Sequence, residues 1–85
     1  MDICAGGTIS VGATQIDFTN NHTEDCTITS SDMPGWPTTD PVIPKRQGGI
    51  AGTGTVYLTT PATAGSYTYT PVCCDQETDP IIRVQ

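Results

Sequence analysis

Apolar residues recur at every second position in several segments of this chain, and no segment repeats them at a helical spacing over a useful length. Ile16 and Phe18 are separated by one polar residue, and so are Ile82 and Val84. This alternation predicts short β-strands that each bury one face. The strands we predict cover residues 8–11, 14–20, 26–29, 54–60, 66–72 and 80–85. Many short strands with Gly and Pro between them indicate an all-β sandwich or barrel.

The alternation is interrupted by a Pro-rich loop at residues 32–49, which contains four prolines. Because proline cannot donate a ladder hydrogen bond, we expect a long loop with at most short edge-strand pieces. The loop holds the only tryptophan, Trp36, together with Met33 and Ile43. One interpretation is that Trp36 covers one end of a small core that needs its large residues. The other is that Met33, Trp36 and Ile43 form a binding surface for a protein partner.

Length and cysteine content indicate a single small domain, residues 1–85, in an oxidising compartment. A chain of 85 residues buries only a small core, and four cysteines in so short a chain predict covalent cross-links. We therefore expect a secreted, periplasmic or cell-surface location. The chain does not open with a positively charged segment and an apolar run, so we expect an export signal to have been removed before Met1.

The charge balance argues against two classes of partner. The net charge is −6, and only three residues are Lys or Arg. Neutralising the phosphates of a nucleic acid requires clustered basic residues, so no nucleic-acid partner is expected. No apolar stretch approaches the length of a membrane span. The acidic composition mainly favours solubility.

The four cysteines allow three disulfide pairings. They are Cys4, Cys26, Cys73 and Cys74. A bridge between the adjacent Cys73 and Cys74 fits disulfide geometry poorly. Two pairings stay open from the residues alone, because Cys26 can join either Cys73 or Cys74 and Cys4 then takes the other.

Two segments resemble the copper-site segments of the cupredoxins, the plastocyanin-like electron carriers. Residues 17–32 read DFTNNHTEDCTITSSD, and residues 65–75 read GSYTYTPVCCD. The family pattern is roughly F/W-x-N-x-D-x-x-x-H-x-V in the first segment. In the second it is roughly G-x-Y-x-Y-x-C-x-x-H, followed by a methionine. The resemblance extends over about residues 8–84 and implies a small Greek-key β-sandwich of the cupredoxin type. An immunoglobulin-like sandwich, as a module of a larger surface protein, is the alternative, because G-x-Y-x-Y also precedes a terminal strand there.

The copper ligands of the family are not retained. The first family histidine falls on Cys26, the ligand cysteine on Pro71 and the second histidine on Cys74, and no methionine follows. The resemblance therefore implies the fold without type-1 copper or its electron transfer, and no cofactor is expected. Because positions 26 and 74 would share one copper ion in the family, the resemblance favours a Cys26–Cys74 bridge, with Cys4 joined to Cys73.

The rival interpretation of the cysteines is a metal or redox site. Thiolates of Cys4, Cys26, Cys73 and Cys74, with His22 nearby, are donors suited to zinc, Cu(I) or an iron–sulfur cluster. No C-x-x-C pair is present, so disulfides are the favoured interpretation. His22 stands outside any recognisable nucleophile motif, and we expect no catalytic residues. The sequence thus predicts a non-enzymatic, exported structural or binding module.

Overall fold

In the computed structural model, which describes residues 1–75 and 79–85, the ordered elements are all β-strands. Among these residues there is no helix with the length and hydropathy that crossing a membrane requires. The strands are β1 (Gly7–Ile9), β2 (Gln15–Asn20), β3 (Cys26–Thr29), β4 (Val42–Ile43), β5 (Gly52–Tyr57), β6 (Gly65–Thr68), β7 (Thr70–Pro71) and β8 (Ile81–Val84). The prediction of an all-β fold is confirmed.

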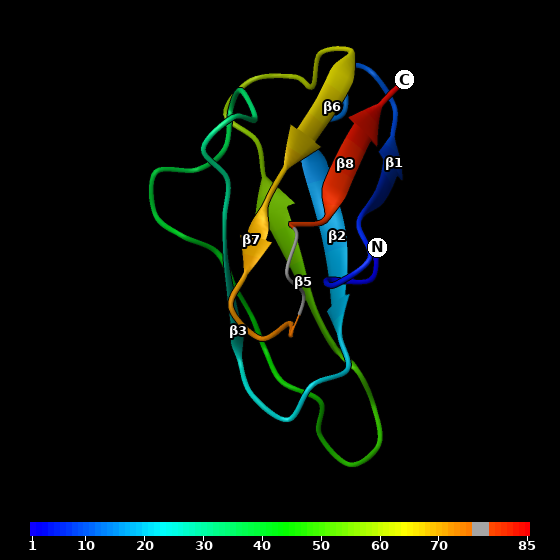
Figure 1. Cartoon of the computed structure of the whole chain (residues 1–85), viewed down its shortest axis with the longest axis vertical. Coiled ribbons are helices and arrows are strands. Elements are labelled where there is room, and N and C mark those ends of the chain that lie inside the picture. Colours follow the sequence, from blue (N-terminus) through cyan, green and yellow to red (C-terminus); the bar gives the residue numbers. More distant parts are fainter. Residues whose placement is uncertain (76–78) are drawn as a thin grey trace.

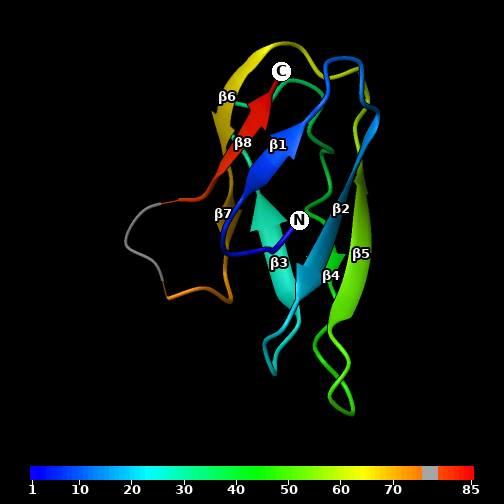
Figure 2. The ribbon, with the colours of Figure 1, turned by 90° about the vertical axis from the view of Figure 1, so that its right-hand side faces the viewer.

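The strands form three small sheets with the orders β1-β8-β6, β2-β5 and β4-β3-β7. The β1–β8 pair is parallel, and the pairs within the other two sheets are antiparallel. In Figure 1, β6, β8 and β1 lie side by side in the upper part of the molecule, with β7 and β3 below β6. Figure 2 shows β2 and β5 as a separate layer that faces the β1-β8-β6 sheet.

The core lies between these layers and is built from the apolar positions of the alternating pattern. Ile16 and Phe18 of β2 are buried, and so are Ile82 and Val84 of β8, as their spacing predicts. The Phe18 ring meets the ring of Tyr69 edge-on, with centroids 5.3 Å apart. Such edge-to-face aromatic pairs contribute beyond the area that they bury.

The single strand predicted over residues 66–72 is wrong, because the structure divides it at Tyr69. β6 pairs with β8, whereas β7 pairs with β3, so the chain passes from one sheet to another between them. Tyr69 is the residue at this crossing, and its side chain is only 1% exposed. Alternation of side chains continues through the crossing, which is why the sequence pattern did not reveal it.

The Pro-rich loop contains one short strand, β4, which pairs with the edge of β3. β5 packs closely against this part of the chain, and two glycines allow the approach. A Cβ at Gly52 would overlap the carbonyl of Pro44, and a Cβ at Gly54 would lie 2.8 Å from Cδ1 of Ile43. The edge-strand expectation for the loop is therefore confirmed, and β5 begins two residues earlier than predicted.

Candidate functional site

All four cysteines are paired in two disulfides, Cys4–Cys74 and Cys26–Cys73. The expectation of two intramolecular bridges is confirmed. The favoured pairing of Cys26 with Cys74 and of Cys4 with Cys73 is wrong, and the other open pairing is the one observed.

The register of β3 and β7 explains the observed pairing. Ile28 lies opposite Pro71 in this antiparallel ladder, so Cys26 and Cys73 are the next opposite pair on the same face. Their Cα atoms are 5.2 Å apart, which suits a disulfide. Cys74 follows one residue further on, beyond the end of β7, and its Sγ is bonded to that of Cys4. Knowledge of which strands pair, which the sequence does not supply, decides between the two pairings.

Cys4 lies in a tight turn at the start of the chain. The backbone N–H of Ile3 donates to the carbonyl of Thr19 in β2, over 3.0 Å. The backbone N–H of Cys4 donates to Oδ1 of Asp2, over 2.8 Å. The turn is therefore attached to β2 by hydrogen bonds that do not depend on the disulfide.

Tyr69 attaches the same turn to the core. Its hydroxyl donates to the carbonyl of Ile3 over 2.9 Å. The pKa of Tyr69 is raised to about 12, mainly because burial disfavours the phenolate; a hydrogen bond with the backbone of Gly6 lowers the pKa, and the nearby Asp2 carboxylate raises it. The neutral phenol is thus the form that holds the turn.

Asn20 at the end of β2 shapes the loop that carries His22. The Asn20 side chain is 0% exposed. Its Nδ2 donates to the carbonyls of Glu24 and Ile43, over 3.0 and 3.2 Å, and its Oδ1 accepts from the His22 backbone N–H over 2.9 Å. The His22 carbonyl accepts from the Arg46 backbone N–H over 2.9 Å. His22 is therefore presented by a loop whose backbone is fixed on both sides.

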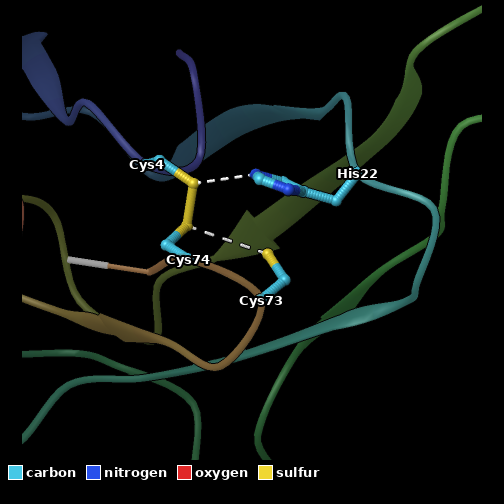
Figure 3. A group of neighbouring side chains, drawn as sticks. All are labelled: Cys4, His22, Cys73 and Cys74. Carbon is cyan, nitrogen blue, oxygen red and sulfur yellow. Dashed lines mark hydrogen bonds between the residues drawn. A yellow bond between two sulfur atoms is a disulfide. The ribbon is translucent and has the colours of Figure 1, made fainter.

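The ring of His22 contacts the Cys4–Cys74 disulfide at a half-buried position (Figure 3). Its Nε2 lies 3.0 Å from Sγ of Cys4. A disulfide sulfur carries no proton, so the hydrogen bond requires His22 to donate from Nε2. The contact joins residues that are 18 positions apart in the chain.

The two disulfides touch each other through the adjacent cysteines. Sγ of Cys73 lies 3.8 Å from Sγ of Cys74, and both sulfurs are visible beside Cys4 and His22 in Figure 3. The donor atoms of Cys4, His22, Cys73 and Cys74 all lie within 4.8 Å of one another. Of the five residues proposed for a metal site, four are thus brought together. Cys26 is not a member of this group; its side chain is 0% exposed, and its Sγ is bonded to that of Cys73.

The predicted binding surface in the Pro-rich loop does not form a surface patch. Met33 and Ile43 are core residues that are 5% and 1% exposed, so their side chains are not available to a partner. Trp36 is partly buried against the same core, and its Nε1 is buried without a hydrogen-bond partner among the described residues. This placement agrees with the interpretation of Trp36 as a cover for the core.

Two exposed apolar side chains flank Thr27 of β3. Val42 of β4 is 53% exposed and lies opposite Thr27 of β3. Val72 is 67% exposed, and its backbone N–H donates to the carbonyl of Thr27. The alternation of Val42 with Ile43 carried this information, since one of two successive strand residues must face outward.

No family model matches this chain, and comparisons with curated proteins and with solved structures give no match. The chemistry of the cysteine and histidine cluster is therefore the basis for a functional hypothesis.

Proposed function

We propose that this protein is a non-enzymatic, exported structural or binding module whose small β-fold is stabilised by two disulfides. The observation that carries the proposal is that all four cysteines are closed into bridges between segments distant in sequence. The bridges join residues 70 and 47 positions apart. Disulfides that close long loops persist in oxidising compartments and stabilise small domains whose core alone is marginal.

We further propose that the fold is a cupredoxin-like sandwich without the copper site. Cys26 and Cys74 occupy positions that correspond to copper ligands in the resemblance. Cys26 is bonded to Cys73 and Cys74 to Cys4, and the sulfurs of Cys73 and Cys74 lie 3.8 Å apart. Pro71, at the position of the ligand cysteine, is buried beside β3 and offers no donor side chain. Convergence of these positions at one place supports a common arrangement of strands.

The surroundings of His22 support a non-enzymatic role. Its Nε2 contacts the sulfur of a closed disulfide rather than a hydroxyl, a free thiol or a carboxylate. Nucleophilic catalysis needs a base within hydrogen-bond reach of an ionisable nucleophile, and a disulfide sulfur is already bonded to its partner. In this state His22 stabilises the turn that holds Cys4.

The experiment is to export the chain to an oxidising compartment and map its disulfides without reduction. Free thiols are first blocked at acid pH, and the intact mass is measured before and after reduction. We expect the mass to rise by four hydrogens on reduction, with peptides linking Cys4 to Cys74 and Cys26 to Cys73. Four blocked thiols in the exported protein would contradict the proposal.

A further inference from the structure

The side chains of Cys4, His22, Cys73 and Cys74, here called the sulfur cluster, are of the types that bind a metal ion. In the observed state the three sulfurs are bonded in disulfides and are not available as thiolate ligands. Three sulfurs and one imidazole nitrogen lie within 4.8 Å of one another. A set of three cysteines and one histidine is a known ligand set of structural zinc sites. Disulfide formation and metal binding compete for the same thiolates, so both interpretations of the cysteines can hold in different redox states.

We infer that reduction of the two disulfides converts this cluster into a four-coordinate site for Zn²⁺, formed by Cys4, His22, Cys73 and Cys74. Each disulfide takes up two electrons and two protons and gives two thiols. With a phosphine as reductant, one water supplies the two protons and its oxygen forms the phosphine oxide. Zn²⁺ then displaces the thiol protons of three cysteines, and the His22 nitrogen completes the tetrahedron.

The distances fit such a site with small movements. Two thiolates at about 2.3 Å from a tetrahedral zinc ion lie about 3.8 Å apart, and a thiolate and an imidazole nitrogen lie about 3.6 Å apart. Sγ of Cys73 and Sγ of Cys74 are already separated by 3.8 Å. Nε2 of His22 is 3.0 Å from Sγ of Cys4, so this pair must open slightly. After reduction the Cys4 and Cys74 sulfurs must separate from about 2 Å to about 3.8 Å, which side-chain rotation can provide.

The backbone around the donors is held by contacts other than the disulfides. The turn with Cys4 is attached to Thr19 and to Tyr69, and the loop with His22 is attached to the buried Asn20. Cys73 and Cys74 follow β7, which is paired with β3. Three separate segments therefore continue to converge at the same place when the sulfur–sulfur bonds are removed. Cys26 stays in the core and takes no part in the proposed site.

The test uses the full chain, fully reduced with a phosphine and kept under inert gas. Titration with Zn²⁺ against a chromophoric chelator gives stoichiometry and affinity, and Co²⁺ serves as the spectroscopic probe for tetrahedral thiolate coordination. We expect one ion per reduced chain, about three protons released per ion, and no binding to the oxidised chain. An oxidised chain that binds equally well, or a reduced chain that does not bind, would overturn the inference.

Matched variants test the role of His22. His22→Ala removes one donor and is expected to lower zinc affinity at least about tenfold, whereas Thr23→Ala, at an exposed position of the same loop, is expected to leave it unchanged. His22→Cys should retain tight binding because it restores a fourth donor. Equal zinc affinities for His22→Ala and Thr23→Ala would overturn the inference. Equal affinities are also the result expected if zinc were bound by the thiolates of an unfolded chain, without His22.

Circular dichroism during the titration covers the case in which the reduced chain unfolds. Zinc binding is then coupled to folding, and we expect one equivalent to restore the β-signal in the wild-type chain and in Thr23→Ala. His22→Ala should need at least about tenfold more zinc. Failure of these tests leaves the disulfide map unaffected, so it is distinguishable from failure of the proposed exported module.

Discussion

The two disulfides begin at neighbouring residues, Cys73 and Cys74, yet they belong to different parts of the molecule. The Cys26–Cys73 bridge starts from a core position of β3, where the Cys26 side chain is 0% exposed. The Cys4–Cys74 bridge is only half-buried, and Nε2 of His22 lies 3.0 Å from its Cys4 sulfur. One bridge is a component of the hydrophobic core, and the other joins the first turn of the chain to the segment after β7.

This difference follows from the partner to which each of the two adjacent cysteines is bonded. The two adjacent cysteines follow the end of β7, and they bond to different segments, Cys73 to β3 and Cys74 to the first turn. Cys73 and Cys74 are both half-buried, but Cys73 is bonded to the fully buried Cys26, whereas Cys74 is bonded to Cys4, which the His22 ring contacts. We expect the inner bridge to contribute more to stability and the outer bridge to be reduced first, whereas the proposed zinc site needs thiolates from both bridges.

The largest expected effect is on stability when each bridge is removed separately. Replacing both cysteines of a bridge by Ala should cost about 3–4 kcal/mol through the entropy of the unfolded chain. Cys26→Ala with Cys73→Ala should cost roughly 1 kcal/mol more than Cys4→Ala with Cys74→Ala, because it also removes a fully buried sulfur. Urea unfolding followed by circular dichroism measures both.

The order of the two stability losses distinguishes the inner bridge from the outer bridge. If the inner-bridge variant is unfolded without urea while the outer-bridge variant folds, the ranking stands. A larger loss of stability in the outer-bridge variant would show that the two regions have been assigned the wrong way round.

Asn20 provides the next largest effect, because it supports the His22 side of the outer region. Asn20→Ala leaves two carbonyls and the His22 N–H without their observed partner, which should cost about 2–4 kcal/mol. Asn21→Ala, at the exposed neighbouring position, should change stability by less than about 0.5 kcal/mol. Urea midpoints measure both, and equal midpoints would contradict a positioning role for Asn20.

Tyr69 connects the two regions, and its ionisation should weaken the fold at high pH. The pKa of Tyr69 is raised to about 12, so the folded chain holds this proton more tightly than the unfolded chain does. The stabilisation is fully present below about pH 10, and up to about 2–3 kcal/mol is lost as pH rises towards about 12.

Tyr69→Phe should remove this pH dependence. It should also cost about 1 kcal/mol at neutral pH, because the hydroxyl no longer donates to the Ile3 carbonyl. Brief urea unfolding experiments between about pH 9 and about pH 12, with thiols absent, compare the two proteins. If the free energy of unfolding changed with pH in the same way in both proteins, the loss of stability at high pH would not come from Tyr69.

The sequence was sufficient to predict the parts of this structure that depend on local alternation. The buried face of β2, with Ile16 and Phe18, and that of β8, with Ile82 and Val84, follow from a period of two. The same rule, applied to Val42 and Ile43, puts one of the two in the core without saying which, and the structure buries Ile43. The prolines of this segment indicate a loop, and a strand of only two residues is too short to show a period of two.

The remaining features depend on which strands pair, and local pattern does not contain that information. The division of residues 66–72 between two sheets and the union of Cys26 with Cys73 both follow from the pairing of β7 with β3. The approach of His22 to Cys4 depends on a turn attached to β2 and on a loop folded around a buried Asn20. These contacts join distant segments, so the sequence indicated the chemistry of the cluster and left its geometry open.

The smallest expected effect is a difference in the rate at which the two bridges are reduced. Thiol–disulfide exchange needs access of the attacking thiolate to a sulfur, and a leaving thiolate is favoured by a nearby hydrogen-bond donor. The Cys4–Cys74 bridge is half-buried and has His22 as donor, whereas Cys26 is fully buried. We therefore expect Cys4 and Cys74 to be released at least about tenfold faster than Cys26 and Cys73, equivalent to about 1.4 kcal/mol in activation free energy.

The protein is treated with a small dithiol reductant in native buffer, and samples are quenched with acid and alkylated at timed intervals. Peptide mass spectrometry then gives the rate at which each of the two bridges is reduced. His22→Ala should slow release of the outer bridge and leave the inner one unchanged, because the His22 ring is hydrogen-bonded to Sγ of Cys4, which belongs to the outer bridge. Thr23→Ala serves as the control at an exposed position of the same loop. Simultaneous loss of both bridges would mean that reduction requires opening of the whole fold, and the distinction between an inner and an outer region would then be structural only.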